Sequence, residues 1–288
     1  MTAKGGLVCA SCNTTYINDG AFPDLIVGGR FDDPPDSARS VYEERSNHFT
    51  AENFLLPLFA RLAPRPRQIL SLGCGNGADV DLLVDAGYEA VGIDCGNRAG
   101  AWPARRHAER FCLANGEHLP FEDATFDLAY CGCVFPHVGV DGDSDRVRPD
   151  YKAKRVAVAT EMTRVLKPGG CVLVSSPNRW CPVDLFHGRT SASPLPRWNP
   201  PGSRFLLAPS DYREIFRSAG CDRFDLLSPA GYWGFLNRRN SWSGRLLVLP
   251  VQAMFGLLSL EQLRFLRGAP ISPWLVMLMH KAKGVPDR

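Results

Sequence analysis

Three glycines stand within five residues in the first third of the chain. Gly73, Gly75 and Gly77 follow a short apolar run that begins at Ile69, and a second apolar run ends on Asp94. Glycine lacks a Cβ atom, so the backbone can turn sharply here and lie against a ligand. An acid at the end of the next strand can accept hydrogen bonds from a ribose diol. The stretch therefore predicts a site for an adenosine-containing cofactor.

The glycine spacing alone leaves the kind of cofactor open. Gly73, Gly75 and Ala78 also satisfy the G-x-G-x-x-G/A pattern of dinucleotide-binding proteins, and Asp94 has the matching offset. A glycine-rich turn without any ligand is the third alternative. It is disfavoured because strand, loop, helix, strand and acid follow one another in the required order.

The segments downstream narrow the choice. In order, they are Cys112–Phe121 (CLANGEHLPF), Phe126–Tyr130 (FDLAY), Glu161–Gly170 (EMTRVLKPGG) and Cys171–Ser176 (CVLVSS). With the glycine motif, this series resembles the class I S-adenosylmethionine-dependent methyltransferases, in the type 11-like branch that acts on small molecules. The resemblance covers about residues 40 to 235. It implies an α/β, Rossmann-like fold: a seven-stranded, mostly parallel sheet with helices on both faces and an antiparallel last strand.

The same resemblance assigns S-adenosyl-L-methionine as cofactor and implies which residues bind it. Asn115 stands where the family usually has an Asp against the adenine amine, and its side-chain oxygen can still accept that hydrogen bond. Leu119 and Phe121 are expected to pack near the adenine. The family's Glu-His pair after the fourth strand is here Pro136-His137, so the role of that acid does not transfer. The expected cofactor-binding residues are Gly73, Cys74, Gly75, Gly77, Asp94, Asn115, Gly116 and Glu117.

Methyl transfer to an acceptor oxygen, nitrogen or carbon requires mainly orientation and exclusion of water. A hydroxyl acceptor also needs a general base. The candidates for that base are His137, His187 and Asp184, and Tyr232 is a candidate for positioning the substrate. Each of these side chains can instead be an ordinary packing or surface residue.

Composition and charge fit one large α/β domain with additions. The chain has 288 residues, of which 45% are hydrophobic, and a net charge of +3, which gives no general reason to expect nucleic acid as partner. The N-terminus lacks the apolar core of a signal peptide, and the ten cysteines form no regular framework. These features favour free thiols and a cytoplasmic location.

Residues 1–40 are predicted to form an N-terminal segment and linker outside the methyltransferase domain at 41–288. Cys9 and Cys12 have the spacing of half a zinc site, but the second pair of ligands is missing. The segment resembles a zinc ribbon found in some ribosomal-RNA guanine methyltransferases, and a degenerate ribbon without metal is favoured over a zinc site. A Pro-rich linker is expected at 32–40. A helix then follows, on which Tyr42 and His48 either line the cofactor site or simply pack.

Three insertions are expected, at about 139–155, 177–208 and 229–273. The first is interpreted as a solvated loop. The second opens with a long loop, Pro177–Trp198, whose length favours a function. The segment Pro177–Trp180 resembles one in many methyltransferases of this branch, and the resemblance implies a wall on the substrate side. The third holds a basic stretch with Arg238, Arg239 and Arg245, followed by the apolar run Leu246–Leu258. That run is either a core or lid helix, or an interfacial helix beside a pocket for an apolar or lipid-linked acceptor.

The remaining elements are a helix from Ser210 to Gly220, a sixth strand at Phe224–Ser228 and a seventh at Trp274–Lys281. The favoured function is O-methylation of a sugar, a lipid-linked saccharide or a secondary metabolite, with contact to a membrane surface as a further possibility. The alternatives are an RNA methyltransferase, suggested by the N-terminal cysteines, and a non-catalytic protein that only binds S-adenosylmethionine. A nicotinamide oxidoreductase is opposed by the downstream motifs.

Overall fold

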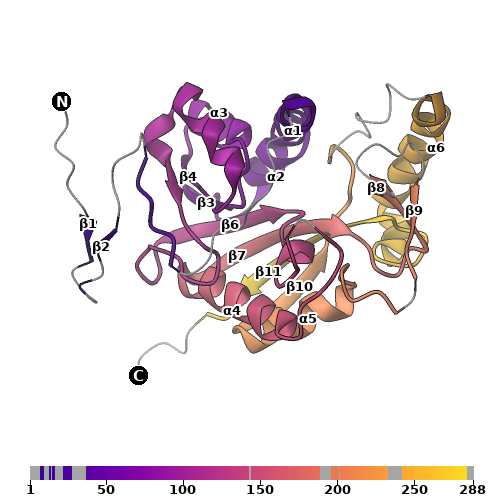
Figure 1. Cartoon of the computed structure of the whole chain (residues 1–288). Coiled ribbons are helices and arrows are strands. Elements are labelled where there is room, and N and C mark those ends of the chain that lie inside the picture. Colours follow the sequence, from indigo (N-terminus) through magenta and orange to yellow (C-terminus); the bar gives the residue numbers. More distant parts are fainter. Residues whose placement is uncertain are drawn as a thin grey trace.

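The computed structural model describes residues 7–9, 13, 15–16, 22–27, 37–142, 144–188, 196–200, 202–232 and 242–283. A seven-stranded sheet with the order β10-β11-β7-β6-β3-β4-β5 forms its centre (Figure 1). Strand β11 is antiparallel to both of its neighbours, whereas the pairs from β7 to β5 are parallel. The predicted fold class is thus confirmed. The strands are β3 (Gln68–Leu72), β4 (Glu89–Asp94), β5 (Phe111–Leu113), β6 (Phe126–Gly132), β7 (Leu166–Pro177), β10 (Cys221–Leu226) and β11 (Trp274–Lys281).

Helices cover both faces of the sheet (Figure 1). On one face lie α1 (Ser37–Thr50), the π-helix η1 (Ala51–Leu55), α2 (Leu56–Arg61) and α3 (Ala78–Asp85). On the other lie α4 (Tyr151–Arg164) and α5 (Pro209–Ser218). Side chains alternate between the two cores with the period of a strand: Leu128 and Tyr130 join the first, Ala129 and Cys131 the second.

Short helical turns and one longer helix fill the connections. The turns are η2 (Asn97–Ala104), η3 (Ala108–Arg110), η4 (Phe135–His137) and η6 (Glu261–Leu266). The longer helix, α6 (Trp242–Ser259), lies in the insertion between β10 and β11. Among the described residues, no helix is long and apolar enough to cross a membrane.

Four local predictions are corrected by the structure. Helix α1 begins at Ser37, so the last four residues of the predicted linker are helical. The predicted long loop Pro177–Trp198 contains a hairpin of β8 (Val183–Gly188) and β9 (Pro196–Trp198). The sixth strand is Cys221–Leu226, displaced toward the N-terminus because Cys221 and Arg223 pair with β11. Helix α5 begins at Pro209, where proline is favoured in the first turn, and not at Ser210.

Part of the N-terminal segment extends the sheet. The amide of Leu25 donates to the carbonyl of Leu113 at 2.8 Å, and the amide of Leu113 donates to Pro23 at 2.9 Å. The edge strand β5 is thereby covered, and the ring of Phe22 packs edge-on against Trp102 with centroids 4.8 Å apart. Further upstream, β1 (Leu7–Val8) pairs with β2 (Thr15–Tyr16) in a short hairpin.

Candidate functional site

The glycine loop follows β3, and its three glycines have different neighbours. Gly73, Gly75 and Gly77 have φ angles of +69°, +56° and +79°, which side-chain-bearing residues rarely adopt. A Cβ atom on Gly73 would overlap Val134, and one on Gly77 would lie 2.5 Å from the ring of Phe111. At Gly75 the nearest atom would be a side-chain carbon 3.4 Å away. Packing therefore demands glycine at the two outer positions, and the middle one has the most room.

Asp94 is hydrogen-bonded directly to this loop. Its Oδ2 accepts from the amide of Gly75 at 2.9 Å, and its Oδ1 accepts from the amide of Gly96 at 2.8 Å. The carbonyl of Gly75 accepts from Nε1 of Trp102 at 2.8 Å. Each carboxylate oxygen has a second lone pair that can accept from a hydroxyl. The structure thus brings together the acid and the glycine that the sequence paired.

The side chain of Cys74, in the middle of the glycine loop, points into the core. The thiol is buried in the core, where a Cβ atom on Gly92 would lie only 2.8 Å from its sulfur, and burial raises its pKa well above the usual range. Its amide donates to Ile93 and its carbonyl accepts from Gly77. A direct side-chain contact between Cys74 and a cofactor is therefore not supported.

Two ion pairs fasten α1 over the segment that follows β4. Arg98 donates to both carboxylate oxygens of Glu43 at 2.7 and 2.9 Å, and both partners are largely buried. Arg105 donates to both oxygens of Glu44 at 2.9 Å. Bidentate pairs of this kind fix geometry as well as charge. The helix before the sheet therefore closes against the cofactor side, although sequence reasoning did not foresee these contacts.

Asn76 carries a buried donor that has no partner among the described residues. Its Oδ1 accepts from Asn47 Nδ2 at 3.3 Å and from the amide of Ala78 at 3.2 Å, whereas its own Nδ2 is buried without an acceptor. A buried amide of this kind favours a ligand with an acceptor atom, such as a carboxylate. Asn47 lies on α1 where the sequence had suggested His48, which is instead exposed and pairs with Glu52.

The predicted adenine side lies after β5. Oδ1 of Asn115 accepts from the amide of Glu117 at 3.0 Å, which leaves this oxygen one lone pair. The carboxylate of Glu117 is held by Lys154 Nζ at 2.9 and 3.0 Å, so it is engaged in an ion pair. Gly116 lies between them, where a Cβ atom would come within 3.4 Å of Leu72. These contacts hold the turn in one shape.

Helix α4 holds the next part of this loop through one ion pair. Glu161 accepts from the amide of Leu119 at 2.8 Å, and Arg164 donates to the carbonyls of Leu119 and Phe121 at 3.0 and 2.8 Å. Burial opposes the charge of Glu161, but the hydrogen bonds from Arg164 and Leu119 outweigh it and lower its pKa. The motif EMTRVLKPGG thus holds the loop between β5 and β6 in place.

The carboxyl ends of β6 and β7 carry a pair of hydroxyls. Gly132 lies opposite Ser175 in the sheet, and the hydroxyls of Ser175 and Tyr232 are hydrogen-bonded to each other. The next residue, Cys133, has a φ of +59°, unusual for a residue with a side chain, and donates its amide to Ser175 at 2.7 Å. Burial raises the pKa of Tyr232, so its hydroxyl is protonated at neutral pH.

The π-helix η1 packs against Tyr232 on one face of the sheet. The ring of Phe54 meets Tyr232 edge-on at 5.1 Å, and Trp274 lies 5.3 Å away on another side. Gly231 has a φ of +77° and packs so closely on the carbonyl of Asn53 that no Cβ atom would fit. Short π-helices are often found at functional sites, and this one seats the tyrosine at the sheet edge.

A second polar cluster lies on the same face of the sheet, further from the carboxyl ends of the strands. Asp79, in the first turn of α3, accepts from Ser71 Oγ at 3.1 Å and from the hydroxyl of Tyr130. Ser71 and Tyr130 lie opposite each other in β3 and β6. Burial raises the pKa of Asp79 in spite of these hydrogen bonds.

The three candidate bases come from two elements. His137 ends η4, and its ring packs edge-on against Phe205 at 5.3 Å. The buried guanidinium of Arg155 fixes the same turn through the carbonyls of Pro136 and Val138 at 3.2 and 3.3 Å. Asp184 and His187 lie in β8, where Asp184 is buried and the side chain of His187 lies outside the described part.

The first insertion is not wholly solvated, contrary to the prediction. Val140 is buried and packs with Phe205 and Leu206, which belong to the second insertion. Arg197 of that insertion pairs with Asp145 at 3.2 Å. The two insertions therefore form one wall beside His137.

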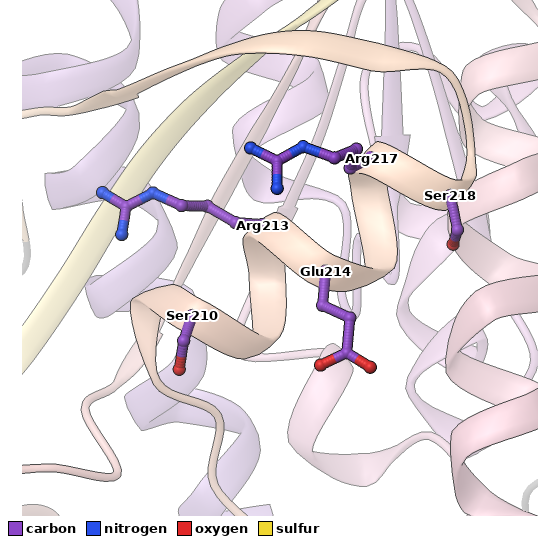
Figure 2. Close-up of a pocket in the computed structure, with 5 residues that line it drawn as sticks. All are labelled: Ser210, Arg213, Glu214, Arg217 and Ser218. Carbon is purple, nitrogen blue, oxygen red and sulfur yellow. The ribbon is translucent and has the colours of Figure 1, made fainter.

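Two further features are the N-terminal cysteines and a hollow on the surface. The carbonyl of Cys9 accepts from the amide of Asn13 at 2.9 Å, while Cys12 lies outside the described residues. The part of the chain that is described holds no cluster of three metal-ligating side chains. A surface hollow of about 520 Å³ is lined by α5 alone: Arg213 and Arg217 extend to one side and Glu214 points away from them (Figure 2). It lies on the sheet face opposite the glycine loop.

Comparisons with known proteins agree with this geometry. Residues 70–174 match the family model described as "Methyltransferase domain". A probable S-adenosylmethionine-dependent methyltransferase of Mycolicibacterium smegmatis is 30% identical over 174 residues, which cover 59% of this chain and 58% of the relative. A ubiquinone biosynthesis O-methyltransferase of Cereibacter sphaeroides is 30% identical over 171 residues, covering 57% and 64%. The chain thus spans less than two thirds of the length of these curated relatives.

Among solved structures, the plantazolicin methyltransferase BamL, in complex with a triazolic desmethylPZN analogue and SAH, superimposes with a TM-score of 0.52. It is 13% identical and covers 87% of this chain and 92% of its own, so the likeness concerns the fold. Residues 70–174 thus match a methyltransferase domain, and the strand order and the glycine loop are those expected for a class I S-adenosylmethionine-dependent methyltransferase fold.

Proposed function

We propose that this chain is an enzyme that transfers a methyl group from S-adenosylmethionine to a hydroxyl of a small acceptor, such as a sugar, a lipid-linked saccharide or a secondary metabolite. The hydrogen-bonded unit of Gly75 and Asp94 carries the first half of this proposal. The O-methyltransferase names among the curated relatives support the second. The hydroxyl pair at the ends of β6 and β7 is suited to hold an alcohol.

The residues present fit the cofactor. Asp94 has lone pairs for the ribose hydroxyls, Asn115 offers an acceptor near the adenine, and Asn76 holds a buried donor for a carboxylate. When bound, S-adenosylmethionine supplies a methyl group on a sulfonium, which is already activated for transfer. The protein then contributes orientation and a dry site. The ion pairs of Glu43 and Glu44 hold α1 closed over this side.

The acceptor would be held by Tyr232 and Ser175. In a hydrogen bond between two hydroxyls one proton is used, so the other hydroxyl can donate to the acceptor oxygen. Tyr232 is a donor and not a base, because burial raises its pKa. An alcohol must lose its proton as it is methylated, and His137 is the proposed general base because Arg155 fixes the turn that carries it.

Methyl transfer from isotope-labelled S-adenosylmethionine to a panel of acceptors tests the proposal. The panel contains phenols, sugars, a polyprenyl-linked saccharide, amines and RNA, and mass spectrometry identifies the methylated atom. Calorimetric titration with S-adenosylmethionine and S-adenosylhomocysteine runs beside it. We expect binding of both adenosyl ligands and a methyl ether in one hydroxyl-bearing class.

The contrary results are equally definite. Transfer only to amines or to RNA would overturn the choice of acceptor while leaving the reaction class. Absence of binding to both adenosyl ligands, with NAD bound instead, would overturn the cofactor. Binding of the adenosyl ligands together with failure of every acceptor class would favour a non-catalytic protein.

A further inference from the structure

Helix α6 exposes a face without charge. Leu246, Leu249 and Leu257 are 68%, 73% and 55% exposed, whereas Val251, Phe255 and Leu258 on the other side are buried in the core. Between Leu246 and Leu257, the further exposed residues among those whose side chains are described are Pro250, Gln252, Ala253 and Gly256. We call Leu246, Leu249, Pro250, Ala253, Gly256 and Leu257 the outer face of α6. Soluble helices normally place polar residues there.

Apolar exposure is concentrated in this region. The described residues include eleven exposed large apolar side chains, and five of them lie between Leu246 and Phe265. Leu260 and Phe265, which follow α6 in the sequence, are also exposed, at 48% and 71%. Large contiguous apolar surfaces of this kind mark sites of interaction.

In the sequence, the segment that contains α6 carries a positive net charge. Residues 237–267 contain five arginines and a single glutamate, a net charge of +4, while the whole chain carries only +3. The one glutamate, Glu261, is paired with Arg267 at 2.7 Å. Within α6 the only charged residue is Arg245. A positive segment next to an apolar helix face is typical of helices that lie in the surface of an anionic membrane.

We propose that the outer face of α6 docks on an anionic phospholipid bilayer. A symmetric contact with a second copy is disfavoured, because it would bring two segments of net charge +4 together. A bilayer surface with acidic headgroups offers both the opposite charge and an apolar phase for the leucines. The helix would lie in the interface, since it does not span a membrane.

The position of α6 connects this surface to the site. Figure 1 shows α6 beyond the ends of β6 and β7, the edge where Tyr232 and Ser175 meet. The buried side of α6 belongs to the same core as Phe54, against which Tyr232 packs. Resting on the proposed function, docking would bring the acceptor site close to a bilayer and favour acceptors that reside there.

Vesicle sedimentation of the full chain, without cofactor or acceptor, tests the docking. Vesicles of phosphatidylcholine with phosphatidylglycerol are compared with vesicles of phosphatidylcholine alone. We expect binding to the anionic vesicles, weakened by high salt and reduced about tenfold or more in Leu246→Glu/Leu249→Glu. Val8→Glu is the control, because Val8 is 62% exposed in the distant N-terminal hairpin and should bind like the wild type.

Equal vesicle binding by the wild type and the double variant would overturn the proposal, as would absence of wild-type binding. A dimer in analytical ultracentrifugation that Leu249→Glu dissociates would assign the face to a second copy instead. Calorimetric binding of S-adenosylhomocysteine confirms that each variant is folded, because none of the changed residues lies at the glycine loop. Since the vesicle assay contains no acceptor, its result is independent of whether methyl transfer is found.

Discussion

The amide of Gly75 donates to Oδ2 of Asp94 across 2.9 Å, so the turn after β3 and the end of β4 form one unit. The same carboxylate also accepts from the amide of Gly96. Asp94 therefore has two tasks: it orders two loops, and it offers its remaining lone pairs to a ribose.

Asp94→Asn should lower the affinity for S-adenosylhomocysteine about 10- to 100-fold, because hydrogen bonds to a charged group are worth about 1.5–3 kcal/mol. Asparagine retains one acceptor oxygen, so it loses the hydrogen bond from the amide of either Gly75 or Gly96, and thermal unfolding measures that loss separately. Calorimetry measures the affinity, with Glu89→Ala at the exposed start of the same strand as control. Unchanged affinity in Asp94→Asn would remove the acid from the cofactor site.

Gly77→Ala should destabilise the fold more than a glycine substitution elsewhere. Its added Cβ atom would lie 2.5 Å from Phe111 at a φ of +79°, so overpacking of about 1–3 kcal/mol adds to a conformational cost of about 1–2 kcal/mol. Gly87→Ala is the matched control, because Gly87 has a φ of +86° but open space around it. Thermal unfolding should show a drop several degrees larger for Gly77→Ala. Equal shifts would mean that Phe111 yields to the methyl group.

The resemblance to class I methyltransferases predicted the central sheet, and local patterns placed some of its elements. The seventh strand, Trp274–Lys281, has the predicted bounds, and Gly87 follows α3 with a positive φ, as is typical of glycine at the end of a helix. Such features depend on residues close in sequence, which is why periodicity and glycine positions reveal them.

Features made by distant partners could not be predicted in this way. The hairpin of β8 and β9, and the pairing of Leu25 with Leu113, require two segments to meet in space. The contacts of α1 with the cofactor side had only one weak signal: Glu43 and Asn47 are four residues apart and thus share a helix face. The role of a polar residue on that face cannot be predicted until Arg98 is known to lie opposite it.

Asp79→Asn should stabilise the protein, and the gain should grow with pH. Burial raises the pKa of this acid above its usual value of 3.8, so folding favours the neutral form. Stability is then greatest below the unfolded pKa and is lost as pH rises through the folded pKa. Asparagine does not titrate, so the melting temperature of the variant should exceed that of the wild type more at pH 8 than at pH 4.

Asp127→Asn provides the control of opposite sign. Burial opposes the charge of Asp127, but hydrogen bonds from Lys167 and from the amides of Gln68 and Arg67 lower its pKa. Its contribution is present above the unfolded pKa and lost as pH falls through the folded pKa, so the substitution should destabilise at pH 8 and matter little in acid. Parallel pH profiles of the two variants would contradict the assignment for Asp79.

His137→Ala should lose turnover and keep cofactor affinity. A general base contributes about 10²- to 10⁴-fold, and the ring is not part of the glycine loop. Single-turnover methyl transfer and calorimetry separate the two effects. Phe205→Leu is the control for the packing of the ring, because Phe205 meets His137 edge-on. Unchanged kcat in His137→Ala would exclude this base, whereas equal losses in both variants would make the ring a packing element.

Tyr232→Phe should lower kcat/KM about tenfold, because it removes one hydrogen bond at the acceptor and leaves the aromatic contacts with Phe54 and Trp274 in place. Thermal stability and S-adenosylhomocysteine affinity should change little. Tyr88→Phe is the matched control, because Tyr88 packs beside Phe59 in the core and is not one of the residues proposed to hold the acceptor. A Tyr232→Phe variant that retains full kcat/KM would show that the hydroxyl serves only to hold Ser175, and the acceptor would then have to be oriented by other groups at the ends of β6 and β7.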